Sequence, residues 1–165
     1  ANGIVLNNTG GAGGLTVTGN GAVADSGGTI QNTTSHAISL TTTNDVNITR
    51  LRVMGPDRAG VKGTDVTNFS YTNSALSGVG DSRVDELDAA FAFNTLGANN
   101  VDGQLTVTGN NVTNPYGGGV IVRNASGTLS QANVSTNTFQ STTDPATSKQ
   151  DGVSLHIEGT PTTAA

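Results

Sequence analysis

The sequence predicts an all-β repeat protein, a β-solenoid, on three observations. The hexapeptide Leu-Thr-Val-Thr-Gly-Asn occurs at residues 15–20 and again, unchanged, at residues 105–110. Short apolar runs that begin with a small residue recur about every 30 residues, and periods of roughly 20–50 residues are typical of solenoids. Gly, Thr, Asn and Ser dominate the composition, which suits many short strands joined by tight turns.

The composition favours a thin core that is renewed in every repeat. Of the 165 residues, 33% are hydrophobic and 4% aromatic, whereas ordinary domains are about 45–50% apolar. Charged residues make up only 12%, and disordered chains with so few apolar residues usually carry more charge. We therefore expect residues 1–165 to form one folded domain, and we expect that domain to be a fragment of a longer solenoid.

The charge balance argues against two classes of partner. The net charge is −5, and the 7 basic residues are scattered along the chain, so there is no basic footprint for nucleic acid or for an anionic membrane surface. The sequence has no Cys, no apolar run as long as a membrane helix and no signal peptide. We expect an extracellular or cell-surface (outer-membrane) location, with no nucleic acid bound and no membrane insertion.

The first strand of each repeat supplies one column of the expected core. Side chains alternate between the two faces of a strand, so every second residue of each run should point inward. The residues expected in this core stack are Ile4, Leu6, Ile38, Leu40, Val61, Phe91, Phe93, Val120, Val122, Val153, Leu155 and Ile157. The residues between them should point outward, namely Val5, Ser39, Lys62, Ala92, Ile121 and Ser154.

A second strand is expected some ten to fifteen residues after each first strand. Its inward pairs are Leu15 and Val17, Val46 and Ile48, Phe69 and Tyr71, Leu105 and Val107, and Ala132 and Val134. An Asn then follows at Asn20, Asn73, Asn110 and Asn137. We expect these four to be left-handed turn residues that stack as a hydrogen-bonded ladder. In the second repeat Arg50 stands in place of the Asn. The five turns lead into third short strands, which carry Ile30, Val53, Leu76, Val112 and Phe139.

The loops between these strands are unequal in length. Residues 81–90 hold the chain's cluster of charge and are predicted to be a loop that leads into the Phe91 strand, with a single helical turn as the alternative. Residues 10–14, 21–28 and 142–150 are loops on composition. Insertions on one face of a solenoid often carry binding, so these loops are the places to look for function.

Three short strands in each repeat of about 30 residues resemble the right-handed parallel β-helix of the pectate-lyase-like superfamily. The sequences of residues 3–10, 13–20, 27–33 and 38–53 look like the parallel β-helix repeats of large secreted bacterial proteins, and residues 112–140 have the same character. This resemblance covers nearly the whole chain and implies a right-handed parallel β-helix of about five to six coils. It says little about activity, because such repeats occur in enzymes, adhesins and fibres alike.

No catalytic site follows from the sequence. The polygalacturonase-like motifs (Asn-Thr-Asp, Asp-Asp, Gly-His-Gly and Arg-x-Lys) are absent. The nearest approach to a lyase calcium site is Asp85, Glu86 and Asp88 with Arg83, but three carboxylates so close in sequence point in different directions, and calcium needs six to eight oxygens. His36 and His156 have no partner at ligand spacing. We expect no catalytic residues, no cofactor and no metal.

Three functions remain as hypotheses. The leading one is a structural or adhesive stalk or fibre module of a secreted or cell-surface bacterial protein, without catalytic activity. Its partners would be further copies stacked end to end, or the rest of a longer chain. The alternative is a carbohydrate-binding or degenerate polysaccharide lyase or hydrolase β-helix, with a glycan as partner. A second alternative is an ice-binding surface, suggested by the Thr-x-Thr pairs at residues 16–18, 106–108 and 136–138.

Overall fold

The computed structural model describes residues 1–11, 13–81, 88–140 and 152–157, and their fold is all-β. The strands are β1 (Ile4–Thr9), β2 (Thr16–Val17), β3 (Thr29–Gln31), β4 (Ile38–Thr49), β5 (Arg52–Met54), β6 (Val61–Thr72), β7 (Ala75–Val79), β8 (Phe91–Phe93), β9 (Val101–Thr108), β10 (Asn111–Pro115), β11 (Val120–Asn124), β12 (Leu129–Ser135), β13 (Thr138–Gln140) and β14 (Val153–Ile157). No helix in this part of the chain is long and apolar enough to cross a membrane.

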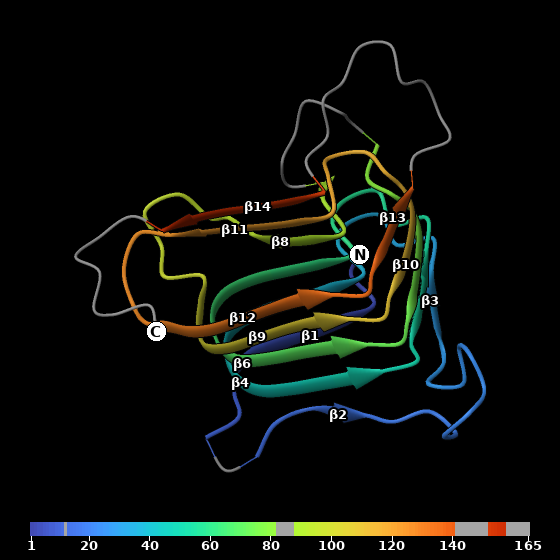
Figure 1. Cartoon of the computed structure of the whole chain (residues 1–165), viewed down its shortest axis with the longest axis horizontal. Coiled ribbons are helices and arrows are strands. Elements are labelled where there is room, and N and C mark those ends of the chain that lie inside the picture. Colours follow the sequence, from blue (N-terminus) through green and yellow to red (C-terminus); the bar gives the residue numbers. More distant parts are fainter. Residues whose placement is uncertain (12, 82–87, 141–151, 158–165) are drawn as a thin grey trace.

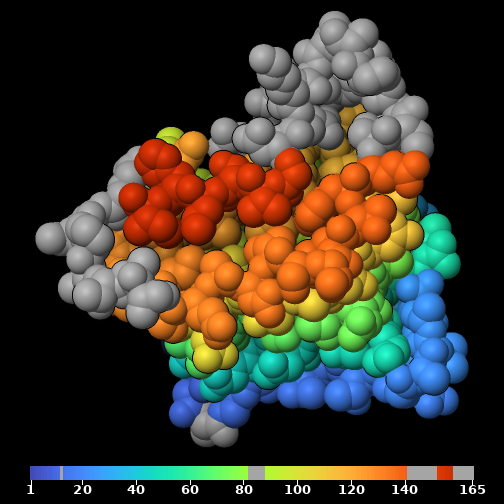
Figure 2. Space-filling view, in the orientation of Figure 1, coloured from blue at the N-terminus to red at the C-terminus, as the bar shows by residue number. Residues whose placement is uncertain are grey.

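The strands form two sheets in which every pairing between described strands is parallel. One path through the 9-stranded sheet is β1-β4-β6-β8-β11-β14, and β2, β9 and β12 extend the same sheet alongside β4 and β6. The 5-stranded sheet has the order β3-β5-β7-β10-β13. Each strand inside a sheet thus lies between the preceding and the following pass of the chain, as the banded colours in Figures 1 and 2 show. This topology is consistent with a parallel β-helix.

Two strands are longer than the sequence pattern predicts. β4 and β6 each have 12 residues and combine the expected first and second strands of their repeats. Thr42 and Asp65 lie within them at φ angles of 48° and 56°. A residue in the left-handed region turns the chain locally, so each strand bends around a corner while its pairing with the neighbouring strand continues on both sides.

The structure places the residues of the expected first column in one continuous series. Ile4 pairs with Ile38, Ile38 with Val61, Val61 with Phe91, Phe91 with Val120, and Val120 with Val153. A second series joins Leu6 to Leu40, and Phe93 to Val122 and Leu155. Burial follows position along this series: the middle members are almost fully buried, Ile4 and Leu6 are half-buried, and Val153 and Leu155 are 50% and 53% exposed.

The other two columns are also continuous. Val17, Ile48, Tyr71, Val107 and Val134 pair in that order, and so do Ile30, Val53, Leu76, Val112 and Phe139. The three columns face one another and form a single apolar cluster. A pattern of alternating apolar residues was sufficient to predict their register, because a slip of one residue would turn every inward side chain to the outside.

Aromatic side chains fill the middle of this cluster. The ring centroids of Phe69 and Phe93 lie 5.1 Å apart in an edge-to-face arrangement, and those of Tyr71 and Phe91 lie 5.1 Å apart in the same arrangement. Such pairs contribute about 0.5–1.5 kcal/mol beyond the area they bury. The four rings come from two successive passes, β6 and β8, and join opposite walls of the interior.

The corner after the second column differs from the sequence prediction. The left-handed residues there are Arg50, Asn73, Gly109 and Thr136, with φ angles between 51° and 70°. The expected left-handed conformation is therefore correct at Asn73 but wrong at Asn20, Asn110 and Asn137. Gly109 adopts a positive φ without a Cβ penalty, and this lets the following Asn110 turn its side chain inward.

The outer face of the first column also departs from expectation. Ala92 and Ile121 were expected to face solvent, yet they are 0% and 6% exposed. They pack with Ala59 and Ala89 in a second, small apolar cluster outside the sheet. Alternation predicted the correct side of the strand, but a strand pattern does not reveal that another segment covers that side.

Candidate functional surfaces

The sequence-predicted carboxylates are only partly within the described structure. Asp85 and Glu86, with Arg83, lie outside the described residues. Asp88 is fully buried, and its Oδ2 accepts a hydrogen bond from the Asp81 backbone N–H at 3.3 Å. Gly80 packs directly against Asp88, because a Cβ placed on Gly80 would lie 2.4 Å from the Asp88 Cβ. Within the described ranges, no group of three or more His, Cys, Asp or Glu side chains is arranged to hold a metal ion.

The two histidines lie apart from these carboxylates. His156 is exposed on β14 and stands opposite Arg123 of β11. His36 is half-buried just before β4. Asp88 precedes β8, so the three residues belong to different passes of the chain.

Asn110 and Asn137 form a ladder with Ser74 at the corner after the second column. The Asn137 Oδ1 accepts hydrogen bonds from the Asn110 backbone N–H at 2.9 Å and from the Asn110 Nδ2 at 3.0 Å. The Asn110 Oδ1 accepts from the Ser74 N–H at 3.0 Å, and the Ser74 Oγ accepts from the Leu51 N–H at 3.0 Å. Each side-chain oxygen therefore binds the backbone of the preceding pass.

The other two predicted ladder positions do not belong to this column. Asn73 is exposed and lies one residue before Ser74, and Asn20 is exposed as well. The predicted frame was displaced because Asn73 looks in sequence like Asn110, although it is level with Gly109. A Ser, which has a short hydroxyl side chain, takes the inward place in that pass.

A second set of buried amides was missed by sequence reasoning. Asn124 is 1% exposed, and its Oδ1 accepts from the backbone N–H groups of Asn100 and Val101 at 3.0 and 3.1 Å. Asn100 is fully buried; its Oδ1 accepts from the Thr95 N–H at 3.0 Å and its Nδ2 donates to the Thr95 carbonyl at 2.9 Å. These amides close the loop between β8 and β9. An Asn at the last position of an apolar strand, as Asn124 is in β11, was the available signal.

Among the described residues, Tyr71 is a buried titratable group whose pKa is clearly shifted. Burial in the apolar cluster raises the pKa of its phenol well above the ordinary range, and a hydrogen bond with Ser74 partly opposes this. Its hydroxyl lies 3.5 Å from the Leu51 carbonyl. The phenol therefore stays neutral at physiological pH and acts as a packing group with a polar end.

One flat face of the molecule carries small polar side chains in rows. This hydroxyl face is formed by β2, the later parts of β4 and β6, β9 and β12, which lie side by side in Figure 1. Its outward columns are Thr16, Asn47, Ser70, Thr106 and Asn133, and then Thr49, Thr72, Thr108 and Ser135. Hydroxyls of neighbouring strands lie 2.9 Å apart at Thr49 and Thr72. Every one of these positions is uncharged.

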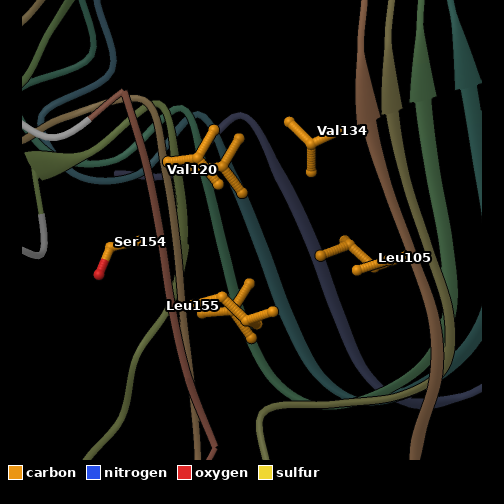
Figure 3. A pocket seen from close by; sticks show the side chains of 8 residues that line it. Leu105, Val120, Val134, Ser154 and Leu155 are labelled. Atoms are coloured by element: carbon orange, nitrogen blue, oxygen red, sulfur yellow. The ribbon is translucent and has the colours of Figure 1, made fainter. Parts of the chain in front are cut away.

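The interior opens at the end formed by the last strands. A pocket of about 200 Å³ lies between the wall of β11 and β14 and the wall of β9 and β12. Figure 3 shows Val120 and Leu155 on one wall, with Leu105 and Val134 facing them from the other. The labelled residues are apolar except Ser154. The pocket is the open end of the apolar core and has no charged lining.

Comparison with protein-family models, with curated proteins and with solved structures gives no match for this chain.

Proposed function

We propose that this chain is a rigid structural module, a stalk or fibre segment built as a right-handed parallel β-helix of about five to six coils. Its setting would be a secreted or cell-surface bacterial protein, and its role would be to hold other parts at a fixed distance. The observation that carries the proposal is how four inward-facing polar groups are used, of which three are buried and Asn137 is half-buried. Ser74, Asn110, Asn124 and Asn137 all bind the backbone of the neighbouring pass.

The physical reasoning follows from this network. A catalytic or binding site keeps polar groups aimed at a ligand, and such groups are left incompletely satisfied by the protein itself. Here the buried amides fix one pass against the next, and three apolar columns run through the same passes. Both features resist bending and sliding between passes, because a buried backbone group that loses its partner costs about 1–3 kcal/mol.

A double-label distance measurement tests the proposed rigidity. The chain has no Cys, so no native residue would react with a thiol-specific spin label. Labels can therefore be attached at Asn7→Cys on β1 and His156→Cys on β14. These residues lie in one outward column, five strand intervals apart. At about 4.8 Å per interval, pulsed electron resonance should give one narrow distance peak near 24 Å plus the label arms.

The width of that distribution decides the outcome. A single narrow peak at low protein concentration, unchanged by added glycans, is the expected result. A distribution broader than that of a label pair within β4 and β6 would contradict a rigid stalk. Glycan-dependent narrowing would instead favour the carbohydrate-binding alternative.

The hydroxyl face favours a second candidate function, binding to ice. Its rows repeat about every 4.8 Å across the strands and roughly 6.6 Å along them, which is a regular lattice of groups that can bind ordered water. We expect thermal hysteresis in concentrated protein solution if this function is real. Thr106→Lys on the face should abolish it, whereas Thr41→Lys on another face should not. Unchanged freezing of the parent chain would exclude this candidate.

A further inference from the structure

We propose that the C-terminal edge of the stack binds the N-terminal edge of a second copy of this chain, head to tail. The C-terminal edge is formed by β14, β12 and β13, and the N-terminal edge by β1, β2 and β3. This inference rests on the proposed structural function and names its partner. The contact would repeat, across two molecules, the parallel strand pairing that joins each pass to the next within one molecule.

The C-terminal edge exposes core residues. Val153, Leu155 and Ile157 are 50%, 53% and 50% exposed, although they continue a column whose member Val120 is fully buried. Beside them lies the apolar pocket of about 200 Å³. In Figure 2 these last strands, in orange and red, lie at the end of the banded stack away from the blue N-terminal strands. Contiguous exposed apolar side chains of this kind mark interaction sites.

The N-terminal edge presents the matching set. Ile4 and Leu6 on β1, Val17 on β2 and Ile30 on β3 are half-buried on the opposite end of the same core. They pack inward on one side, and no described strand lies on the other. Among the strands that the structure describes, β1 pairs only with β4 and β3 only with β5.

The two edges agree in register because they end the same columns. The first column runs from Ile4 on β1 to Val153 on β14. The second runs from Val17 to Val134, and the third from Ile30 to Phe139. A second copy placed one strand spacing above the first would set apolar residue on apolar residue in all three columns. The contact would then be continuous with the interface that already joins β1 to β4.

The direction of the strands selects head-to-tail association. Two C-terminal edges could join only by a two-fold rotation. The two β14 strands would then run antiparallel, and the three apolar columns would be out of register. A head-to-tail contact keeps all strands parallel. Because such a contact does not use the same patch on both molecules, it can repeat without closing and form filaments. Exposed parallel edges are templates for this kind of growth.

Sedimentation velocity on the full chain over a concentration series tests the proposal. The expected result is a ladder of species at multiples of 16.5 kDa, enhanced by sulfate because excluded salts strengthen apolar burial. Leu155→Asp should raise the concentration for half-association by at least about tenfold, equivalent to about 1.4 kcal/mol. His156→Asp puts the same charge on the outer side of the same strand and should leave association unchanged.

A mixing experiment tests the head-to-tail direction. Leu155→Asp blocks one edge and Leu6→Asp blocks the other, so each variant alone should remain monomeric. Together they should form dimers and nothing larger, because each supplies the edge that the other lacks. Asn7→Asp is the matched control for Leu6→Asp, and circular dichroism verifies that each variant is folded. Ile157→Asp and Ile4→Asp replace any variant that is not.

Three results would overturn the proposal. The first is a parent chain that stays monomeric at millimolar concentration. The second is association that the edge variants leave unchanged. The third is dimerisation of Leu6→Asp alone, which would show a contact between two C-terminal edges. A monomer that still gives a narrow label distance removes this inference and leaves the proposed structural function in place.

Discussion

Replacing Phe91 by Ala is expected to lower the free energy of unfolding by about 3–5 kcal/mol, the usual cost of truncating a buried Phe. Phe91 is fully buried, it lies between Val61 and Val120 in the first column, and its ring meets Tyr71 edge to face. Truncation would leave a cavity between three passes. The loss is large because the neighbouring backbone is fixed by strand pairing on both sides and cannot collapse into the space.

Urea unfolding followed by far-ultraviolet circular dichroism and by tyrosine fluorescence measures this loss. The matched control is Leu96→Ala, since Leu96 is 77% exposed and exposed positions usually change stability by less than about 0.5 kcal/mol. A change below about 1 kcal/mol for Phe91→Ala would contradict its place in the stack. Repeat stacks can unfold in parts, so agreement between the two probes should be established first.

Asn124→Ala is expected to cost about 2–4 kcal/mol, although it removes no apolar surface. The Asn124 Oδ1 accepts from two backbone N–H groups, and its Nδ2 donates to the Val101 carbonyl at 2.6 Å. Alanine would leave these groups buried without partners, at about 1–3 kcal/mol for each unsatisfied group, with some relief if water enters. The same bonds hold the loop before β9, so this loop should lose its order together with the bonds.

Urea unfolding and hydrogen exchange test this effect together. The amide protons of Asn100 and Val101 should exchange faster in Asn124→Ala than in the parent chain, whereas those of β6 should exchange at a rate set by the whole fold. Asn133→Ala removes the same side chain from the exposed surface of β12 and should change stability by less than about 0.5 kcal/mol. Equal effects of the two substitutions would contradict the bonding role of Asn124.

The sequence was informative where one strand pattern decides the answer. The three apolar columns, from Ile4, Val17 and Ile30 onward, follow from alternation and from the repeat, and the structure pairs their members in the expected order. The pattern did not predict that β4 and β6 run through a corner. A left-handed Thr42 or Asp65 has no sequence signature of its own, because these residue types also occur in ordinary strands and loops.

Features that depend on several passes at once were not accessible from the sequence. Asn73 and Asn110 follow similar strands, yet only Asn110 turns inward, because Gly109 takes the strained corner position. Burial of Ala92 and Ile121 depends on a segment that covers the outer face. The Thr-x-Thr pairs at residues 16–18 and 106–108 could be seen in the sequence, but only the strand pairing shows that Asn47 and Ser70 lie between them in one row.

Label pairs along one outward column test most directly whether successive passes stack as a single rigid rod. Asn7 pairs with Thr41 across one strand interval, and it is separated from His156 by five. The label separation should therefore rise from about 5 Å to about 24 Å, with similarly narrow widths for both pairs. A long pair that is no farther apart than the short one, or that is spread over many distances, would contradict the stacked arrangement.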